Sequence, residues 1–230
     1  MTTTLITGAN KGLGFETARR LIEAGHTVWM GARDAERGRA AAEQLGGRFV
    51  QLDVTSDDSV AAASTLIAAE GGLDVLINNA GVAGSFEPAA EQTTADAIGV
   101  FEVNILGIVR LITAFAPVLR ESGAPTIVNV TSGLGSFALV HDESRVESQV
   151  IAPFYNASKS AVTMLTVQYA RVFPKFRINA ADPGYTATDL NNHSGPQTVT
   201  EGTDAIVELA TRGGSGATGT FIDRAGVAPF

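Results

Sequence analysis

Short apolar runs alternate with helical patterns along most of the chain. The runs are four to six residues long and rich in Val, Ile and Thr, which is typical of buried strands. They are Thr3–Thr7, Thr27–Gly31, Arg48–Leu52, Val75–Asn78, Thr126–Thr131, Arg177–Ala181 and Thr220–Asp223. Between them, apolar residues recur at helical spacing. This alternation predicts an α/β fold, a parallel sheet of about seven strands covered by helices on both faces.

The chain shows no linker or internal repeat, so we expect one domain over residues 1–230. Residues 133–152 are polar and irregular, which predicts a surface loop or a short helix. The most apolar stretch, Ile98 to Leu119, is interrupted by Glu102, Asn104 and Arg110. These polar residues favour a buried helix over a membrane span.

Composition narrows the function classes. The formal net charge is −8 and there is no Cys, which excludes disulfides, thiolate metal sites and a Cys nucleophile. The acidic balance argues against nucleic-acid binding and a polybasic membrane surface. No signal peptide is evident at the N-terminus, so we expect a soluble, cytoplasmic protein. His141 and His193 lie in variable segments without further ligand candidates, so no metal site is predicted.

A glycine-rich turn follows the first apolar run. It reads Thr7-Gly8-Ala9-Asn10-Lys11-Gly12-Leu13-Gly14 and leads into a helical pattern. Glycines permit a tight turn, and a helix N-terminus presents free N–H groups to a pyrophosphate. The sequence therefore predicts a dinucleotide site, with an ordinary glycine-rich connection as the alternative.

The end of the second apolar run bears on which nucleotide is bound. An acidic group there favours the ribose hydroxyl of NAD, whereas an arginine favours the 2′-phosphate of NADP. Asp34 precedes a helical stretch and is expected to act as its N-cap, which leaves Arg33 at the strand end. Lys11 adds a second cation, so NADP is favoured over NAD. Asp53 follows the third run and is a candidate for the adenine amino group, or a turn residue ahead of Ser56.

Tyr155 and Lys159 stand four residues apart on a predicted helix, so their side chains share one face. A phenol with a pKa of about 10 is a poor acid at neutral pH, and a nearby ammonium lowers that pKa. Such a pair suits proton transfer to or from an oxygen. The alternative is an exposed helix pair without a catalytic role. The chain has only 3 Tyr, which makes this spacing less expected by chance.

The ordered set of motifs resembles the short-chain dehydrogenase/reductase family over essentially the whole chain. The residues that carry the resemblance are Thr7 to Gly14, Asp53, Asn78-Asn79-Ala80-Gly81, Asn104, Ser132, Tyr155, Lys159 and Pro183-Gly184. The glycine turn looks like that of carbonyl reductases. The resemblance implies a Rossmann-like, doubly wound fold.

The resemblance also implies roles for single residues. Tyr155 would be the acid/base, Lys159 would hold the nicotinamide ribose and lower the Tyr155 pKa, Ser132 would bind the substrate oxygen, and Asn104 would support a proton relay. The neighbouring Thr131 could point inward in place of Ser132. The implied cofactor contacts are Gly8, Asn10, Lys11, Gly12, Leu13, Gly14, Arg33, Asp53, Val54, Asn79, Ala80, Gly81, Tyr155, Lys159, Pro183, Gly184, Thr186 and Thr188.

Two segments are expected beside the substrate. Ser132 and Tyr155 are separated by more residues than is common in the family, and the extra residues fall in 133–152. This insertion puts the family's tetramer in doubt and leaves a monomer or homodimer. Residues 185–200 are expected to form a lid. Tyr185, Leu190, Phe137 and Phe154 are candidates for its apolar wall or for core packing.

The function predicted from the sequence is an NADP-dependent oxidoreductase of the carbonyl reductase or ketoreductase type. Hydride would pass between the nicotinamide and a small-molecule carbonyl or alcohol substrate. Two alternatives stay open. One is reduction of a 3-oxoacyl group or of a C=C or C=N bond. The other is a non-catalytic NADP-binding sensor or scaffold.

Overall fold

Eight strands form one sheet in the computed structural model, which describes residues 1–85 and 87–230. The strands are β1 (Thr3–Thr7), β2 (Thr27–Ala32), β3 (Arg48–Gln51), β4 (Val75–Asn78), β5 (Thr126–Val130), β6 (Arg177–Ala181), β7 (Phe221–Asp223) and β8 (Gly226–Val227). Their order is β3-β2-β1-β4-β5-β6-β7-β8. The first seven are parallel, and the short β8 pairs antiparallel with β7. The seven predicted strands are confirmed to within one residue at each end, and β8 is an addition at the edge.

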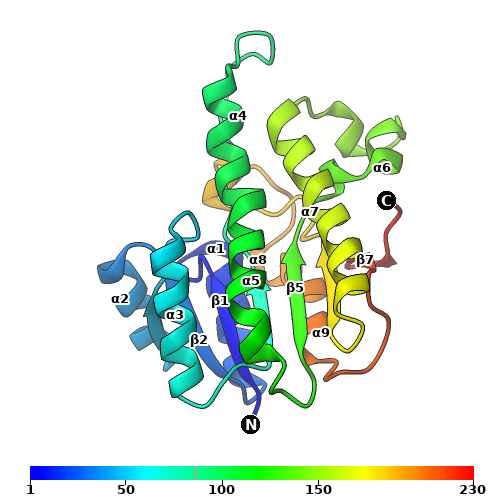
Figure 1. Ribbon diagram of the computed structural model, residues 1–230. Coiled ribbons are helices and arrows are strands. Elements are labelled where there is room, and N and C mark those ends of the chain that lie inside the picture. The colour runs from blue at the N-terminus through cyan, green and yellow to red at the C-terminus, as the bar shows by residue number, and fades with distance from the viewer. Residues whose placement is uncertain (86) are drawn as a thin grey trace.

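Helices cover both faces of the sheet (Figure 1). One face carries α1 (Gly12–Glu23), α2 (Ala35–Leu45) and α9 (Asp204–Thr211), and the other carries α3 (Asp57–Ala69), α5 (Gly107–Leu119) and α7 (Pro153–Val172). This is the doubly wound arrangement that alternating strands and helices predict. The shorter elements are α4 (Thr94–Phe101), α6 (Phe137–His141), α8 (Val199–Gly202), a π-helix at Glu102–Leu106, and 3₁₀ turns at Gly133–Gly135, Val146–Gln149 and Asp189–Asn191.

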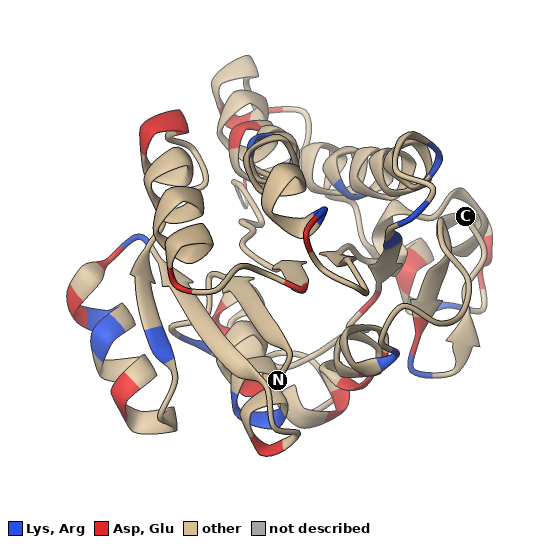
Figure 2. Cartoon of the chain, turned by 60° about the horizontal axis from the view of Figure 1, so that its bottom comes forward, with Lys and Arg blue, Asp and Glu red and all other residues tan. Residues whose placement is uncertain are grey.

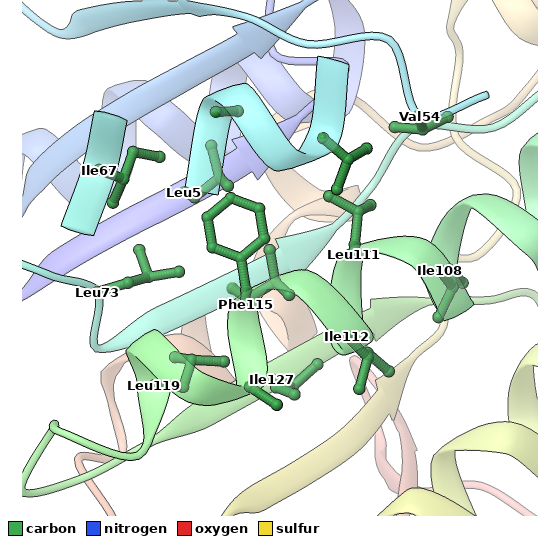
Figure 3. Close-up of a cluster of buried hydrophobic side chains, with 14 of the residues drawn as sticks. Leu5, Val54, Ile67, Leu73, Ile108, Leu111, Ile112, Phe115, Leu119 and Ile127 are labelled. Carbon is green, nitrogen blue, oxygen red and sulfur yellow. The ribbon is translucent and has the colours of Figure 1, made fainter. Parts of the chain in front are cut away.

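The core under α3, α5 and α7 is built around an aromatic ring. Phe115 points from α5 toward the sheet, among Leu5 of β1, Ile127 of β5 and Ile67 of α3 (Figure 3). All four side chains are fully buried. Each contributes roughly 1.5–3 kcal/mol by leaving water, which fixes the helices against the sheet.

Charged residues are nearly absent from the strands. Within the described strands only Arg48, Arg177 and Asp223 carry charge, all of them on β3, β6 or β7. Figure 2 shows the blue and red segments mainly on helices and loops, for example interspersed along α2. The central strands are covered on both faces, where an unpaired charge would be costly.

Polar side chains cap the starts of α2 and α3. The Asp34 carboxylate accepts hydrogen bonds from the N–H groups of Glu36 and Arg37, and the Ser56 hydroxyl accepts one from Ser59. Both caps satisfy N–H groups that a helix end leaves free. The expectation for Asp34 is therefore confirmed, and its carboxylate is engaged with α2.

The segment Thr94–Leu119 is long and apolar enough, by length and composition alone, to cross a membrane. Its second half is the core helix α5, as the sequence predicts, with Leu111, Phe115 and Leu119 buried against the sheet. Its first half, α4, extends beyond the sheet in Figure 1 and buries only Val100. The π-helix joins the two halves.

The segment 133–152 folds into two 3₁₀ turns and the short helix α6. It is held against the C-terminal residues, because the Ser136 hydroxyl donates to the Pro229 carbonyl at 2.8 Å and the Ala138 N–H donates to Phe230. It also approaches α7 closely. A Cβ at Gly135 would lie 2.5 Å from the backbone carbon of Lys159. The insertion is thus packed against the helix that carries Tyr155.

The order of the strands reverses at β1, with β2 on one side and β4 on the other. The connections that follow β1 and β4 leave toward opposite faces, which opens a crevice at the carboxyl ends of these strands. The glycine turn follows β1 and the Asn79-Ala80-Gly81 segment follows β4. Tertiary structure therefore brings these two motifs to one edge.

Candidate active site

The glycine turn is fastened to the end of β4 by side-chain hydrogen bonds. The Thr7 hydroxyl accepts from the backbone N–H groups of Asn79 and Ala80, both at 3.0 Å. The Asn79 amide donates to the carbonyls of Thr7 at 2.8 Å and Gly8 at 3.2 Å. A Cβ at Gly14 would lie 2.5 Å from the Gly8 carbonyl and 2.6 Å from the Asn79 amide nitrogen. The turn therefore requires glycine at position 14.

The first turn of α1 is open to a ligand. Its N-cap residue, Lys11, makes no side-chain capping hydrogen bond. The first N–H groups of a helix carry a partial positive charge and bind anions. Gly12 adopts a left-handed φ of 56°, which glycine tolerates and other residues rarely adopt. Backbone amides and a small turn are the features that a pyrophosphate requires.

A cleft of about 660 Å³ extends from this turn across the sheet edge. Sixteen of the eighteen cofactor residues expected from the sequence line it: Gly8, Asn10, Lys11, Gly12, Leu13, Gly14, Arg33, Asp53, Val54, Asn79, Ala80, Gly81, Tyr155, Lys159, Pro183 and Thr188. The other two, Gly184 and Thr186, line a neighbouring cavity of about 370 Å³. The Thr186 hydroxyl donates to the Pro183 carbonyl at 2.8 Å, so this side chain supports the loop.

The far end of the cleft carries both an arginine and a carboxylate. Arg33 is exposed and lines the cleft, whereas Asp34 is held as the cap of α2. The Asp53 carboxylate accepts from the N–H and hydroxyl of Thr55, at 2.9 and 2.7 Å. Burial alone would raise the pKa of Asp53, but these bonds and the charge of Arg33 hold it below its usual value. Asp53 is therefore an anion fixed in a turn.

An ion pair between Lys11 and Asp189 crosses the cleft near the glycine turn. Lys11 donates to Asp189 at 2.8 Å, and His193 contacts the other oxygen of the same carboxylate at 2.9 Å. Asp189 lies in the segment predicted to be the lid, 178 positions from Lys11 in the chain. The segment expected to form the lid is thus tied to the turn through Lys11 and Asp189, with His193 beside the same carboxylate.

Tyr155 stands where the two cavities meet, since it lines both of them. The Lys159 ammonium lies 5.5 Å from the centre of its ring and donates to the Val130 carbonyl at 3.0 Å. Ser132 follows β5, lines the smaller cavity together with Tyr155 and acts to lower the pKa of its phenol. The structure therefore brings together three of the four residues expected to act in catalysis.

Burial shifts the pKa values of Tyr155 and Lys159. Burial, together with the nearby Asp182 carboxylate, raises the pKa of Tyr155 to about 12, against the effect of the Ser132 hydrogen bond. Burial lowers the pKa of Lys159 to about 8, although Asp182 opposes this. A lowering of the Tyr155 pKa by Lys159 stays a prediction; in this structure the ammonium donates to the Val130 carbonyl. The phenol is therefore protonated at neutral pH.

The structure distinguishes the two neighbouring hydroxyls that the sequence left open. Thr131 is buried, and its hydroxyl bonds to the Lys159 carbonyl and to Thr163, both within α7. Ser132 lines the smaller cavity with Tyr155. The side chain that faces this cavity is therefore Ser132, while Thr131 holds β5 against α7.

Asn104 lies in the π-helix beside the site but lines neither cavity. Its side-chain oxygen accepts from the Val82 N–H at 2.9 Å. Its amide donates to the Val82 carbonyl and to the Ser158 hydroxyl, both at 3.0 Å. These bonds connect the segment after β4 to α7, so the side chain positions the site. A proton relay at Asn104 stays a prediction.

The smaller cavity has an apolar wall that agrees in part with the sequence-based expectation. Tyr185 and Leu190 line it. Phe137 and Phe154 are absent from the described lining residues. Phe137 is 70% exposed, and the ring of Phe154 packs edge-on against Phe101 at 6.3 Å. Phe137 therefore belongs neither to the wall nor to the core, whereas Phe154 takes part in packing. Val146, Val150 and Ile151 of the insertion line the cavity instead.

Sequence reasoning missed four carboxylates at the site. Asp182, Glu147 and Glu87 line the smaller cavity, and Asp189 lines the larger cleft. Asp182 could have been found, because it directly follows β6 at the carboxyl edge where parallel sheets place their ligands. Glu147 and Asp189 lie in irregular segments whose conformation the sequence does not specify.

The described residues fit a dinucleotide cofactor. The glycines at positions 8, 12 and 14 keep side chains out of the turn, and α1 presents its uncapped N-terminus. Gly81 lies beside this part of the cleft, since a Cβ there would be 3.3 Å from Oδ1 of Asn104 and 3.7 Å from the Lys159 ammonium. The cleft then runs from Arg33 to Tyr155, the two ends that an adenosine phosphate and a nicotinamide would occupy.

Comparison with known proteins agrees with this geometry. The family model described as short chain dehydrogenase matches residues 2–198. Short-chain dehydrogenase anuI of Penicillium roqueforti is 36% identical, over 91% of this chain and 88% of that protein. The (-)-isopiperitenone reductase of Mentha piperita is 32% identical, over 96% of this chain and 95% of that protein.

The fold is also that of a solved reductase. An NADPH-bound carbonyl reductase from chicken fatty liver superimposes with a TM-score of 0.87 at 25% identity. The match covers 100% of this chain and 99% of that chain. The similarity therefore extends over the whole length of the chain.

Proposed function

This chain belongs to the short-chain dehydrogenase family, and we propose that it is an NADP-dependent oxidoreductase that reduces small-molecule carbonyl compounds. The observation that carries the proposal is the position of Tyr155. Its side chain lines both the large cleft and the smaller cavity, with Lys159 in one and Ser132 in the other. A proton donor at such a junction can serve a substrate oxygen next to a cofactor.

Tyr155, Ser132 and Lys159 each have a separate role in the proposed reaction. When bound, the nicotinamide would supply the hydride. Tyr155 holds a proton on its phenol oxygen at neutral pH, since its pKa is raised to about 12, and it would donate that proton to the substrate oxygen. Ser132 would hold that oxygen by a hydrogen bond. The Lys159 ammonium would stabilise the phenolate that forms.

The preference for NADP is supported by the charges at the adenosine end of the cleft. Arg33 lines this end and Lys11 lines the cleft at the glycine turn, and both are cations that can pair with a 2′-phosphate. Asp34, the carboxylate that would otherwise select a ribose hydroxyl, is bonded to the first turn of α2. Asp53 is bonded to Thr55. The carbonyl reductase with a similar fold is described as NADPH-bound.

The direct test follows oxidation of NADPH and, separately, of NADH, with a panel of aldehydes, ketones and quinones. Tyr155→Phe should lower the rate by roughly 10² to 10⁴-fold, the range typical of general acid catalysis. Tyr169→Phe is the matched control, because Tyr169 stacks on Phe173 away from both cavities. An unchanged rate in Tyr155→Phe would contradict the assignment.

Replacing Arg33 tests the preference for NADPH over NADH separately. Arg33→Ala should raise the KM for NADPH by at least about tenfold, as expected for loss of a charge-assisted phosphate contact, and leave that for NADH nearly unchanged. Tight binding of NADPH without turnover of any substrate would instead favour the non-catalytic sensor. Equal losses with both cofactors would show that Arg33 does not select the phosphate.

A further inference from the structure

The smaller cavity has carboxylates in its wall that the proposed reaction does not use. Asp182, Glu147 and Glu87 line it, and the described lining residues include no Lys, Arg or His. The rest of the lining is mostly apolar or neutral. The charge of this wall therefore has one sign, next to the phenol of Tyr155.

Two of these carboxylates converge on one point. A Cβ at Gly133 would lie 2.8 Å from Oε1 of Glu147 and 3.0 Å from Oδ2 of Asp182. Both residues are buried, Asp182 with 4% of its surface exposed and Glu147 with 9%. Because position 133 is glycine, the space between the two oxygens is kept free of a side chain. Oδ2 of Asp182 and Oε1 of Glu147, the latter bonded to Arg145 at 2.9 Å, therefore lie close together in the cavity wall.

Few cationic groups contact the carboxylates of Asp182 and Glu147. Arg145 donates to both oxygens of Glu147, at 2.9 and 3.1 Å. Asp182 accepts backbone N–H groups from Gly184 and Gly133, and it makes no ion pair with any described side chain. Burial raises the pKa of Asp182, and the charges of Glu147 and Asp223 add to this effect. One guanidinium thus stands among three carboxylates.

We propose that this cavity selects carbonyl substrates that carry a protonated amine over those that carry a carboxylate, and that Asp182 determines the preference. An ammonium group entering the cavity meets a buried carboxylate, where charge attraction is stronger than in water. An anionic group loses its hydration and meets no cationic side chain among the described lining residues. This inference rests on the proposed reductase activity, because it names the substrate class of the same site.

Three acetophenones that differ only in charge test the proposal. They carry a methyl, an aminomethyl or a carboxylate group, each at the meta or para position of the ring. The wild-type protein should reduce the aminomethyl compound with a kcat/KM roughly tenfold or more above that of the methyl compound, the lower end for close buried charge pairs. The carboxylate compound should be the poorest substrate.

Two variants test whether Asp182 causes the preference for the aminomethyl compound. Asp182→Asn should bring the aminomethyl-to-methyl ratio of kcat/KM close to one. Glu143→Gln is the matched control, since Glu143 is an exposed carboxylate of the same insertion outside the cavity lining, and it should keep the wild-type ratio. Taking the ratio removes any common effect of Asp182 on Tyr155. If Asp182→Asn does not fold, Glu147→Gln replaces it, because it leaves Arg145 as a free cation and should favour the carboxylate compound.

The outcomes separate this inference from the proposed function. Equal efficiency with all three compounds, or a preference that persists in both cavity variants, overturns the inference and leaves the reductase assignment intact. Calorimetric binding of benzylammonium and benzoate measures the same preference without turnover. Benzylammonium binding that Asp182→Asn abolishes, in a protein that reduces none of the ketones, supports the charge preference and contradicts the proposed function.

Discussion

The ammonium of Lys159 lies 5.5 Å from the ring centre of Tyr155 and donates to the Val130 carbonyl at 3.0 Å. Lys159 is only 6% exposed, so its charge is held in a poorly solvated site. Its pKa is lowered to about 8 as a consequence. Holding the Lys159 ammonium in this site therefore costs folding free energy. The ammonium lies beside Tyr155, where a phenolate would form.

Replacing this lysine should make the protein more stable and less active. The lowering of the Lys159 pKa from 10.5 to about 8 corresponds to roughly 3 kcal/mol, which Lys159→Met would recover at neutral pH. Below pH 8 folded and unfolded chains both carry the proton, so the folded state bears the full cost. Between pH 8 and 10.5 the folded state loses its proton first, and the difference from wild type should vanish.

Thermal unfolding of wild type and Lys159→Met at a series of pH values checks this prediction. Lys175→Met is the control, because Lys175 is exposed and its removal should give no such pH dependence. A variant that is less stable than wild type at pH 7 would show that the hydrogen bond to Val130 outweighs the cost of the buried charge.

Gly14→Ala should destabilise the protein and weaken cofactor binding. The added methyl would lie 2.5 Å from the Gly8 carbonyl and 2.6 Å from the Asn79 amide, so the turn and the end of β4 must separate. Overpacking of this kind costs typically 1–3 kcal/mol. Gly99→Ala, in α4 with no heavy atom near the added methyl, should be neutral or slightly stabilising. Urea denaturation of both variants measures the contrast.

Thr7→Val should loosen the glycine turn without changing its volume. The variant removes the acceptor for the N–H groups of Asn79 and Ala80, and each buried group left unpaired costs about 1–3 kcal/mol. We expect a lower midpoint of urea unfolding and a higher KM for NADPH. Thr7→Ser keeps the hydroxyl and should recover most of the cofactor affinity. A KM that is raised equally in Thr7→Ser would point to the methyl group instead.

Asp189→Asn should increase the affinity for NADPH and leave that for NADH unchanged. Lys11 and Asp189 are both more than half exposed, so their ion pair contributes at most about 1 kcal/mol. Releasing Lys11 for a 2′-phosphate should therefore lower the Kd for NADPH by up to about fivefold. Fluorescence titration with each cofactor gives the comparison, and Glu43→Gln on α2 controls for the change in net charge. Equal changes in the Kd for NADPH and for NADH would show that the effect does not come from pairing of Lys11 with the 2′-phosphate.

The sequence alone specified the features that depend on neighbouring residues. Strand runs, the glycine turn and the caps at Asp34 and Ser56 follow from local hydrophobic pattern and backbone hydrogen bonding. Tyr155 and Lys159 share a helix face because they are four residues apart, which holds for any helix. These local rules do not fix the sheet order or its short eighth strand.

Tertiary structure alone decided which distant groups meet. It turned Ser132 toward Tyr155 and Thr131 into α7, a choice between adjacent residues that depends on how β5 packs. It joined Lys11 to Asp189, and it directed Asp182 and Glu147 to one point beside Gly133. Such contacts arise when strand ends converge and irregular segments pack, and no period in the sequence encodes them. The charge of the substrate cavity, and with it the proposed selectivity, is therefore a property of the fold.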